Sequence, residues 1–257
     1  MKSSIIQTLI LFSFQILAGS AKSSKKIHNG ILTRSHEFEF EVSIKYRFAH
    51  LCAGSIITTR HVITSASCVT AEPYVIYANL KILSGTKDVT GESSGNFHQV
   101  SQVAIHKNYE PTNCWRNDIA ILKIKSRFIF NRFRQKATLP FYNFVPKSLL
   151  VAGWGGIDGN INRFLNKIGI LSLRSDSRCQ SAFSAYNFVH ATQLCGTPTD
   201  FQARITHGDG GGPVISIDNE NLIAVVSASI LNTLGFPMIS TLIYPFLDFI
   251  NEIITTY

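Results

Sequence analysis

Short segments in which apolar residues alternate with polar ones, or run together, recur along most of the chain. They cover residues 42–46, 119–124, 168–173, 213–217 and 222–226, with turn-forming residues between them. Many short strands of this kind predict an antiparallel sandwich or barrel. The pattern therefore indicates an all-β chain.

The carboxyl-terminal segment has a different period and reads as a helix. Pro245 suits a first helical turn, and apolar residues then recur at helical spacing from Phe246 to Ile254. We expect this helix to dock one apolar face on the rest of the fold. The chain after the leader has no repeat of fixed period and no linker-like stretch.

The amino-terminal residues predict a leader. Lys2 precedes an apolar stretch over residues 5–18, and small residues follow at 19–21, which is typical of a signal peptide. A membrane anchor is the alternative, but polar residues interrupt the stretch and it is shorter than the ~20 residues of a spanning helix. We therefore expect a signal peptide over residues 1–21, a short pro-segment over 22–26, and a secreted, extracellular protein.

Composition excludes several classes of protein. The 257 residues are 45% hydrophobic and 16% charged, which argues against intrinsic disorder. The formal net charge is +8, but loss of residues 1–26 removes four lysines and leaves 20 basic against 16 acidic residues. So small an excess gives little support to a nucleic-acid binder, and we expect no nucleic-acid partner and no membrane partner.

The number and spacing of cysteines and histidines limit which disulfides and metal sites the chain can form. There are five cysteines, so at least one has no partner within the chain. Histidines do not cluster with acids or cysteines at the spacing of a metal site. We expect no cofactor and no metal.

Four segments in order along the chain carry a specific resemblance. They are Ile27-His28-Asn29-Gly30, Cys52-Ala53-Gly54-Ser55 with Thr64-Ser65-Ala66-Ser67-Cys68, Asn117-Asp118-Ile119-Ala120, and Gly208-Asp209-Gly210-Gly211-Gly212-Pro213. In order and spacing they resemble the chymotrypsin-like (trypsin-like) serine protease family, which Gly153-Trp154-Gly155 and the terminal helix also fit. The resemblance implies that residues 27–257 form two six-stranded antiparallel β-barrels, with the functional cleft between them and a C-terminal α-helix.

The chain departs from the family at two catalytic positions. The position of the family's histidine, just before the second cysteine, is Ser67, and the position of its nucleophilic serine is Gly210. Asp118 alone survives, and its role in the family is to orient an imidazole that is missing here. Loss of the nucleophile or the base alone costs about 10⁶ in turnover, so the resemblance implies a catalytically inactive homologue.

The chain keeps the family's anion-binding backbone groups and has one candidate to replace the missing base. Backbone N–H groups of Gly208 and Gly210 occupy the family's anion-binding positions. His207, at the expected rim of the substrate pocket, is the candidate for a rescuing base, whereas His61 falls outside the cleft. A surface or structural histidine is the alternative reading of His207.

The family alignment also places residues of the specificity pocket. It puts Arg204 on the floor and Met238 where a glycine usually leaves the pocket open, with Ser227 and Ser229 in the wall. One explanation of these pocket residues is that they changed without selection after catalysis was lost. The alternative is a pocket reshaped to bind a carboxylate.

The resemblance pairs Cys52 with Cys68 and Cys179 with Cys195. The bridge that ties the nucleophile loop to the pocket wall is absent, because Thr206 occupies one half. Cys114 is left over, either as an unpaired thiol or in an intermolecular bridge.

The activation device of the family is partly kept. Cleavage between Lys26 and Ile27 would free an ammonium able to pair with Asp209. Asp209 as a satisfied core acid in an unprocessed chain is the alternative.

A basic strip is the other candidate binding feature. Lys123, Lys125 and Arg127 share strand parity, and Arg132, Arg134 and Lys136 repeat the spacing. A solvated outer face is one reading, and a docking strip for a sulfated glycan is the other.

These inferences predict a secreted, monomeric serine protease homologue that acts as a binding, decoy or regulatory protein. The expected partner is an extracellular protein, either a protease, an inhibitor or a protease substrate. The alternatives are a residual or repurposed serine endopeptidase and a binder of glycans or anionic surfaces.

Overall fold

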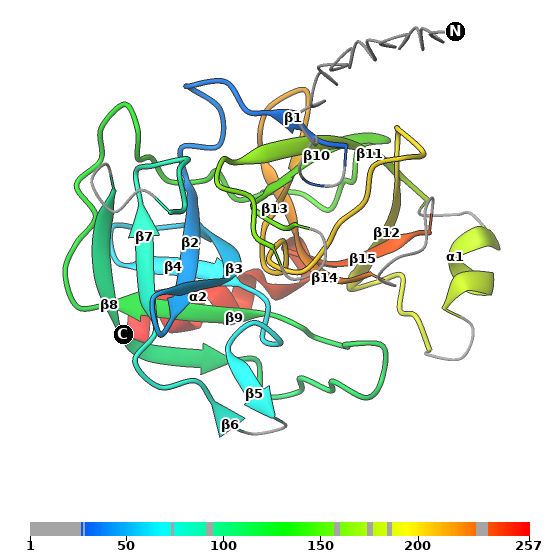
Figure 1. Ribbon diagram of the computed structural model, residues 1–257. Helices are drawn as coiled ribbons and strands as arrows, with labels where there is room; N and C mark the ends of the chain where they lie inside the picture. The colour runs from blue at the N-terminus through cyan, green and yellow to red at the C-terminus, as the bar shows by residue number, and fades with distance from the viewer. Residues whose placement is uncertain are drawn as a thin grey trace, which may run out of the picture.

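The computed structural model describes residues 27, 29–72, 75–90, 95–156, 160–173, 177–183, 187–229 and 236–257. The predicted signal peptide and pro-segment lie outside the described residues. The fold consists mostly of strands, as the sequence predicted, and places two barrels side by side (Figure 1).

Six strands close the first barrel in the order β2-β3-β4-β9-β8-β7. Their bounds are β2 Glu41–Tyr46, β3 Ala49–Ile56, β4 His61–Thr64, β7 Lys81–Ser84, β8 Asn96–Ile105 and β9 Ala120–Ile124. A separate two-stranded sheet joins β5 Thr70–Glu72 to β6 Val75–Ile76. Every pairing within the barrel is antiparallel.

Alternation along β2 explains which side chains fill this barrel. Val42 and Ile44 are fully buried in its core, whereas Glu41, Ser43 and Lys45 point to the other face of the strand. These three polar side chains are also buried, because other parts of the chain cover the outer face of β2. Ser43 finds its partner in His50 on the neighbouring strand β3, and Lys45 donates to the carbonyl of Val89.

The second barrel contains six strands and one short edge addition. The strands are β10 Ser148–Gly153, β11 Asn166–Ser172, β12 Gln193–Pro198, β13 Pro213–Ser216, β14 Leu222–Ser229 and β15 Met238–Leu242. Pairing of β11 with β12 closes the sheet, and β1 Ile31–Leu32 pairs with the outer side of β11. The expectation of two six-stranded antiparallel barrels is confirmed.

Helices are few within the described part of the chain. A short helix α1, Ser177–Ala182, follows β11, and a 3-10 turn η2, Tyr244–Phe246, leads into α2, Leu247–Thr256. The predicted terminal helix is confirmed, with Pro245 in the 3-10 turn at its start. Phe246 and Ile250 bury the apolar face of this segment in the core cluster of the first barrel.

The two barrels are joined by hydrogen bonds that cross between them. The backbone N–H of Ala53 donates to the carbonyl of Gly210 over 2.8 Å, and the indole N–H of Trp154 donates to the carbonyl of Lys87 over 2.8 Å. These bonds fix the loop that contains Gly210 against β3. In the described part of the chain, no helix is long and apolar enough to cross a membrane.

Candidate functional site

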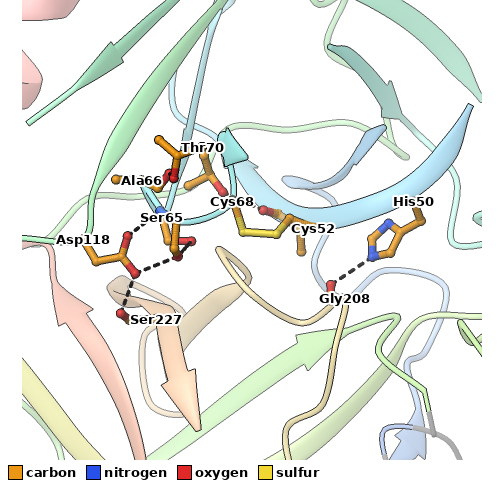
Figure 2. The surroundings of a disulfide bond; sticks show 12 residues. His50, Cys52, Ser65, Ala66, Cys68, Thr70, Asp118, Gly208 and Ser227 are labelled. Carbon is orange, nitrogen blue, oxygen red and sulfur yellow. Dashed lines mark hydrogen bonds between the residues drawn. A yellow bond between two sulfur atoms is a disulfide. The ribbon is translucent and has the colours of Figure 1, made fainter. Parts of the chain in front are cut away.

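Asp118 is a fully buried carboxylate immediately before β9. Its Oδ1 accepts a hydrogen bond from the backbone N–H of Ser67 over 2.7 Å. Its Oδ2 accepts bonds from the hydroxyls of Ser67, over 2.9 Å, and Ser227, over 2.5 Å (Figure 2). Serine groups thus occupy both oxygens of this carboxylate.

Burial controls the ionisation of Asp118. Removal from water raises the pKa of Asp118 to about 6, and hydrogen bonds from Ser227 and Ser67 oppose part of that rise. The hydrogen bonds therefore offset only part of the cost of burial, and the carboxylate is ionised at neutral pH.

A disulfide holds Ser67 in place. The turn closes with a hydrogen bond from the Cys68 N–H to the Ser65 carbonyl, and Cys68 is bonded to Cys52 on β3. The Ser67 hydroxyl lies near both the Ser65 hydroxyl and Asp118, but it has a single proton to donate. Donation to the charged carboxylate is the stronger bond, so Ser65 acts as donor to Ser67.

Gly210 lies across the same disulfide. A Cβ added to Gly210 would lie 3.0 Å from Sγ of Cys68 and 3.3 Å from Sγ of Cys52. These contacts are tighter than ordinary van der Waals packing. The loop has therefore closed onto the disulfide in a way that favours glycine at this position.

Ser67 and Gly210 line one cavity of about 320 Å³ between the barrels. Thr206, His207, Gly208 and Ser227 also contribute to its lining. The structure therefore brings together the positions that the sequence analysis assigned to the degenerate triad and the anion-binding loop.

Two backbone donors point to a ligand-binding role for this cavity. Within the described part of the chain, neither the N–H of Gly208 nor that of Gly210 forms a hydrogen bond. Both glycines line the cavity. A carbonyl oxygen or an anion of a ligand would satisfy such a pair of donors.

His50 is a part of the site that the sequence analysis missed. Its Nδ1 lies 2.8 Å from the Ser43 hydroxyl and its Nε2 lies 2.9 Å from the carbonyl oxygen of Gly208. Burial lowers the pKa of His50 to about 4, with the Gly208 carbonyl opposing and the charge of Lys45 assisting. The ring is therefore neutral, and its Nε2–H anchors Gly208 from the side of the disulfide opposite Asp118 (Figure 2).

Of the other two candidate histidines, one lines the cavity and one does not, as the alignment implied. His207 is exposed and lines the cavity. His61 is buried in β4, bonds to the Thr58 hydroxyl through Nδ1, and does not line the cavity. Among the described residues of the lining, His207 is the only histidine.

The proposed pocket residues do not all reach this cavity. Neither Arg204 nor Met238 is among the described residues that line it, whereas Ser227 is. Met238 is buried in the core cluster of the second barrel, and Arg204 is half-buried. The side chain of Ser229 lies outside the described residues.

Asp209 is a second fully buried carboxylate, and Thr206 is its main partner. It accepts hydrogen bonds from the Gly155 N–H over 2.7 Å, the Thr206 N–H over 2.8 Å and the Thr206 hydroxyl over 3.3 Å. Burial raises the pKa of Asp209 to about 6, and these bonds oppose the rise. Ile27 is fully buried in the second core cluster, whereas Lys26 lies outside the described residues, so cleavage between them stays a prediction.

The expected disulfides are confirmed. Cys52–Cys68 and Cys179–Cys195 form, with Cα atoms 5.9 and 6.2 Å apart. Cys114 is a free, buried thiol packed in the cluster that contains the second disulfide. Burial raises the pKa of this thiol and removes it from contact with another chain, which favours the unpaired state over an intermolecular bridge.

The basic strip forms only in part. Lys125 and Arg127 are exposed, but they follow the end of β9 at Ile124. The expectation for Arg134 is wrong, because this side chain is buried and donates to Asn96 and to the carbonyl of Ile129. The alternation of side chains between two faces does not apply to these residues, because they follow the end of the strand. Among the described residues, no group of three or more His, Cys, Asp or Glu side chains is arranged to hold a metal ion.

Comparisons with known sequences agree with this architecture. A family model described as Trypsin matches residues 27–250. A venom serine protease of Polistes dominula is 28% identical over 243 residues, covering 85% of each chain. Trypsin alpha of Drosophila erecta is 27% identical over 208 residues, covering 79% of this chain and 77% of the trypsin.

Solved structures show the same fold at lower identity. The structure titled GrC superposes with a TM-score of 0.75 at 20% identity, covering 88% of this chain and 98% of the other. Human heparin binding protein superposes with a TM-score of 0.75 at 22% identity, covering 89% and 96%.

Proposed function

The chain belongs to the trypsin-like serine protease family, and we propose that it is a secreted, non-catalytic member that binds an extracellular protein in the cleft between its barrels. The observation that carries this proposal is Gly210. This position provides a backbone N–H and no side chain where the family has its nucleophile.

The second support comes from Ser67 and Asp118. Ser67 replaces the family's base, and both of its donors are directed at the Asp118 carboxylate. Ser227 occupies the remaining capacity of Oδ2. Because removal of the nucleophile or the base alone lowers turnover about 10⁶-fold, the absence of both argues for a role without peptide hydrolysis.

Features that serve binding are retained while those that serve bond cleavage are replaced. The cavity of about 320 Å³ keeps two unpaired N–H donors at Gly208 and Gly210, and His50 holds the first of these in place. A peptide carbonyl of a partner fits such donors, and Gly210 has no side chain to attack it. A protease inhibitor or a protease substrate presents this chemistry in an extended segment.

An extracellular location agrees with both the chain and its relatives. The two disulfides are compatible with an oxidising compartment, and the leader predicts export. A relative at 28% identity is named a venom serine protease. Monomeric state, partner identity and the biological process stay predictions.

A residual serine endopeptidase is the second candidate, because His207 lines the same cavity as Ser67. A fluorophosphonate probe separates the two. We expect no labelling of the secreted protein under conditions that label trypsin completely. Labelling that Ser67→Ala or His207→Ala abolishes, together with peptide hydrolysis, would overturn the non-catalytic proposal.

The binding role is tested with a variant that fills the cleft. Ala228 lines the cavity, so Ala228→Trp should displace a bound segment, whereas Ala191→Trp on the exposed surface is a matched control. Protein retained from the native extracellular fluid by the wild type and by Ala191→Trp, but not by Ala228→Trp, is the expected result. Equal retention by all three would place the partner outside the cleft.

Binding of sulfated glycans is a third candidate, and exposed Lys125 and Arg127 favour it. Lys123 is less available, because its ammonium donates to the carbonyl oxygen of Tyr257. Elution from heparin at the same salt concentration for the wild type and a Lys123, Lys125 and Arg127 triple alanine variant would exclude this candidate.

A further inference from the structure

Glu41, on the outer face of β2, is a buried carboxyl group without a partner. Its side chain is 3% exposed, and neither Oε1 nor Oε2 accepts a hydrogen bond within the described part of the chain. Its neighbours on this face are satisfied, because Ser43 bonds to His50 and Lys45 donates to the carbonyl of Val89. An unpartnered carboxyl is costly to bury, so Glu41 needs an explanation.

Glu41 forms part of the wall of a cavity of about 310 Å³. The wall also includes Phe38, Glu39, Thr86, Lys87 and Phe133. None of its lining residues is shared with the cleft between the barrels. The cavity is therefore a separate site.

The one ammonium in the wall is already engaged. The Lys87 ammonium donates to the backbone carbonyls of Arg34 and Glu37, and among the described ion pairs it forms none with Glu41. Glu39 adds a second carboxylate to the wall, and its side chain is 24% exposed. Two acidic side chains thus face the cavity. In the described part of the chain, the Lys87 ammonium beside them donates its hydrogen bonds to backbone carbonyls and not to either carboxyl group.

The charges around Glu41 disfavour its ionised form in the absence of a ligand. Burial raises the pKa of Glu41 well above its ordinary value, the charge of Asp209 adds to the rise, and the charge of Lys87 opposes it. A cation placed in the cavity would compensate the carboxylate directly. An anion would instead meet Glu39 at the wall and Asp209 behind Glu41.

We propose that this cavity binds a small organic cation, a primary ammonium or guanidinium on a short apolar stem, with Glu41 as its counter-ion. The rings of Phe38 and Phe133 provide an apolar wall for the stem. Charge-assisted hydrogen bonds to both oxygens of Glu41 would satisfy the orphaned acceptors. A divalent metal ion does not fit, because no described group of three or more metal-binding side chains is present.

Calorimetric titration of the full secreted protein tests the site with three ligands of one size. Pentylamine, pentanol and pentanoate differ only in the polar end, and we expect the amine alone to bind. Nα-acetyl-lysine amide and Nα-acetyl-arginine amide form the second arm. Tighter binding of these amides than of pentylamine identifies a protein side chain as the natural source, and the reverse order identifies a free amine.

Variants assign the binding to this cavity. Glu41→Gln should weaken amine binding at least about thirtyfold, since loss of one partner of a buried charge pair has an effect of that size. Ser35→Phe, at the exposed rim, should weaken amine binding by blocking entry to the cavity. This variant keeps Glu41 and therefore tests the site even if Glu41→Gln folds poorly. Glu72→Gln, at an exposed acid of β5, is the matched control and should bind as the wild type does.

Proton release provides a further readout. Because Glu41 must ionise to pair with the amine, binding near neutral pH should release protons, measured in buffers of different ionisation enthalpy, and weaken as the pH falls. Amine binding that survives both Glu41→Gln and Ser35→Phe would overturn the proposal. Preferential binding of pentanoate, or no binding by any cation in either arm, would also overturn it.

Discussion

The hydroxyl of Ser67 donates a hydrogen bond to Oδ2 of Asp118 over 2.9 Å, and its backbone N–H donates to Oδ1 over 2.7 Å. One small residue therefore occupies both oxygens of a fully buried carboxylate. The pair is a closed structural unit between β4 and β9, and it does not need an imidazole to be complete.

Rebuilding the triad should not restore an efficient protease. In the double variant Ser67→His with Gly210→Ser, the new serine Cβ would lie 3.0 Å from Sγ of Cys68, so its neighbours must give by a few tenths of an ångström. Rates depend steeply on positioning, since a misplacement of about 1 Å costs about 10²-fold, and we expect kcat/KM on tryptic and chymotryptic peptides to stay well below that of trypsin.

The control for this prediction adds Arg204→Asp and Met238→Gly to the double variant. Because neither residue lines the cleft cavity and emptying the buried Met238 site lowers stability, we expect this quadruple variant to cleave peptides after Lys or Arg no faster than the double variant does. Brisk cleavage of such peptides by the double variant alone would contradict the prediction.

The buried Asp118 should lower stability as the pH rises from about 4 to about 6. Its pKa is about 6 in the folded chain against an ordinary value of 3.8, so the folded state binds more protons in this window. The effect approaches about 3 kcal/mol. Asp209 has the same pKa and adds a fall of its own, so urea denaturation across this window should show a smaller fall in Asp118→Asn than in the wild type. A difference between the two proteins that is equal at pH 4 and pH 7 would exclude the contribution of Asp118.

The half-buried His50 should act in the opposite direction. Its pKa is about 4 in the folded chain against 6.5 ordinarily, so the unfolded chain binds more protons between these values. The stability that it contributes is present above about pH 6.5 and is lost as the pH falls through 4. His50→Asn should flatten this loss in the same denaturation series, and a loss of equal size in the variant would show that His50 is not its source.

Cys114 should be unreactive in the folded protein. The thiol is 1% exposed and burial raises its pKa, so little thiolate is present and reagents have no access. We expect iodoacetamide to modify no cysteine of the native protein and a single cysteine after unfolding in guanidinium without reductant. Alkylation of Cys114 in the native state, located by mass spectrometry, would contradict this assignment.

Local patterns predicted the features that depend on neighbouring residues. Alternation in β2 identified Val42 and Ile44 as core positions, and the family resemblance implied both disulfides. Ser67 and Gly210 were found because motifs fix their places relative to adjacent residues. The structure brings both to one cavity.

Features that depend on distant partners were not predictable from the sequence. His50 is 158 residues from Gly208, and its role becomes visible only when the barrels are placed together. Glu41 reads as a polar position on an exposed strand face, and only the folded chain shows that it is buried. The prediction for Arg134 was wrong for a related reason. The chain forms a turn between Asn131 and Arg134, whereas the alternating pattern is valid only within a strand.

Thr206 has a consequence for how the cleft responds to its surroundings. Where the family alignment has a covalent cross-link to the pocket wall, this chain has two hydrogen bonds from Thr206 to the Asp209 carboxylate. A carboxylate with a pKa of about 6 loses its charge in mildly acidic fluid, and charge-assisted bonds weaken when that happens. The loop beside the cleft is therefore insensitive to reductants at this point. Mild acid weakens these bonds but also removes the cost of burying a charge, and because burial raises the pKa of Asp209, the net effect of protonation is to stabilise the folded loop.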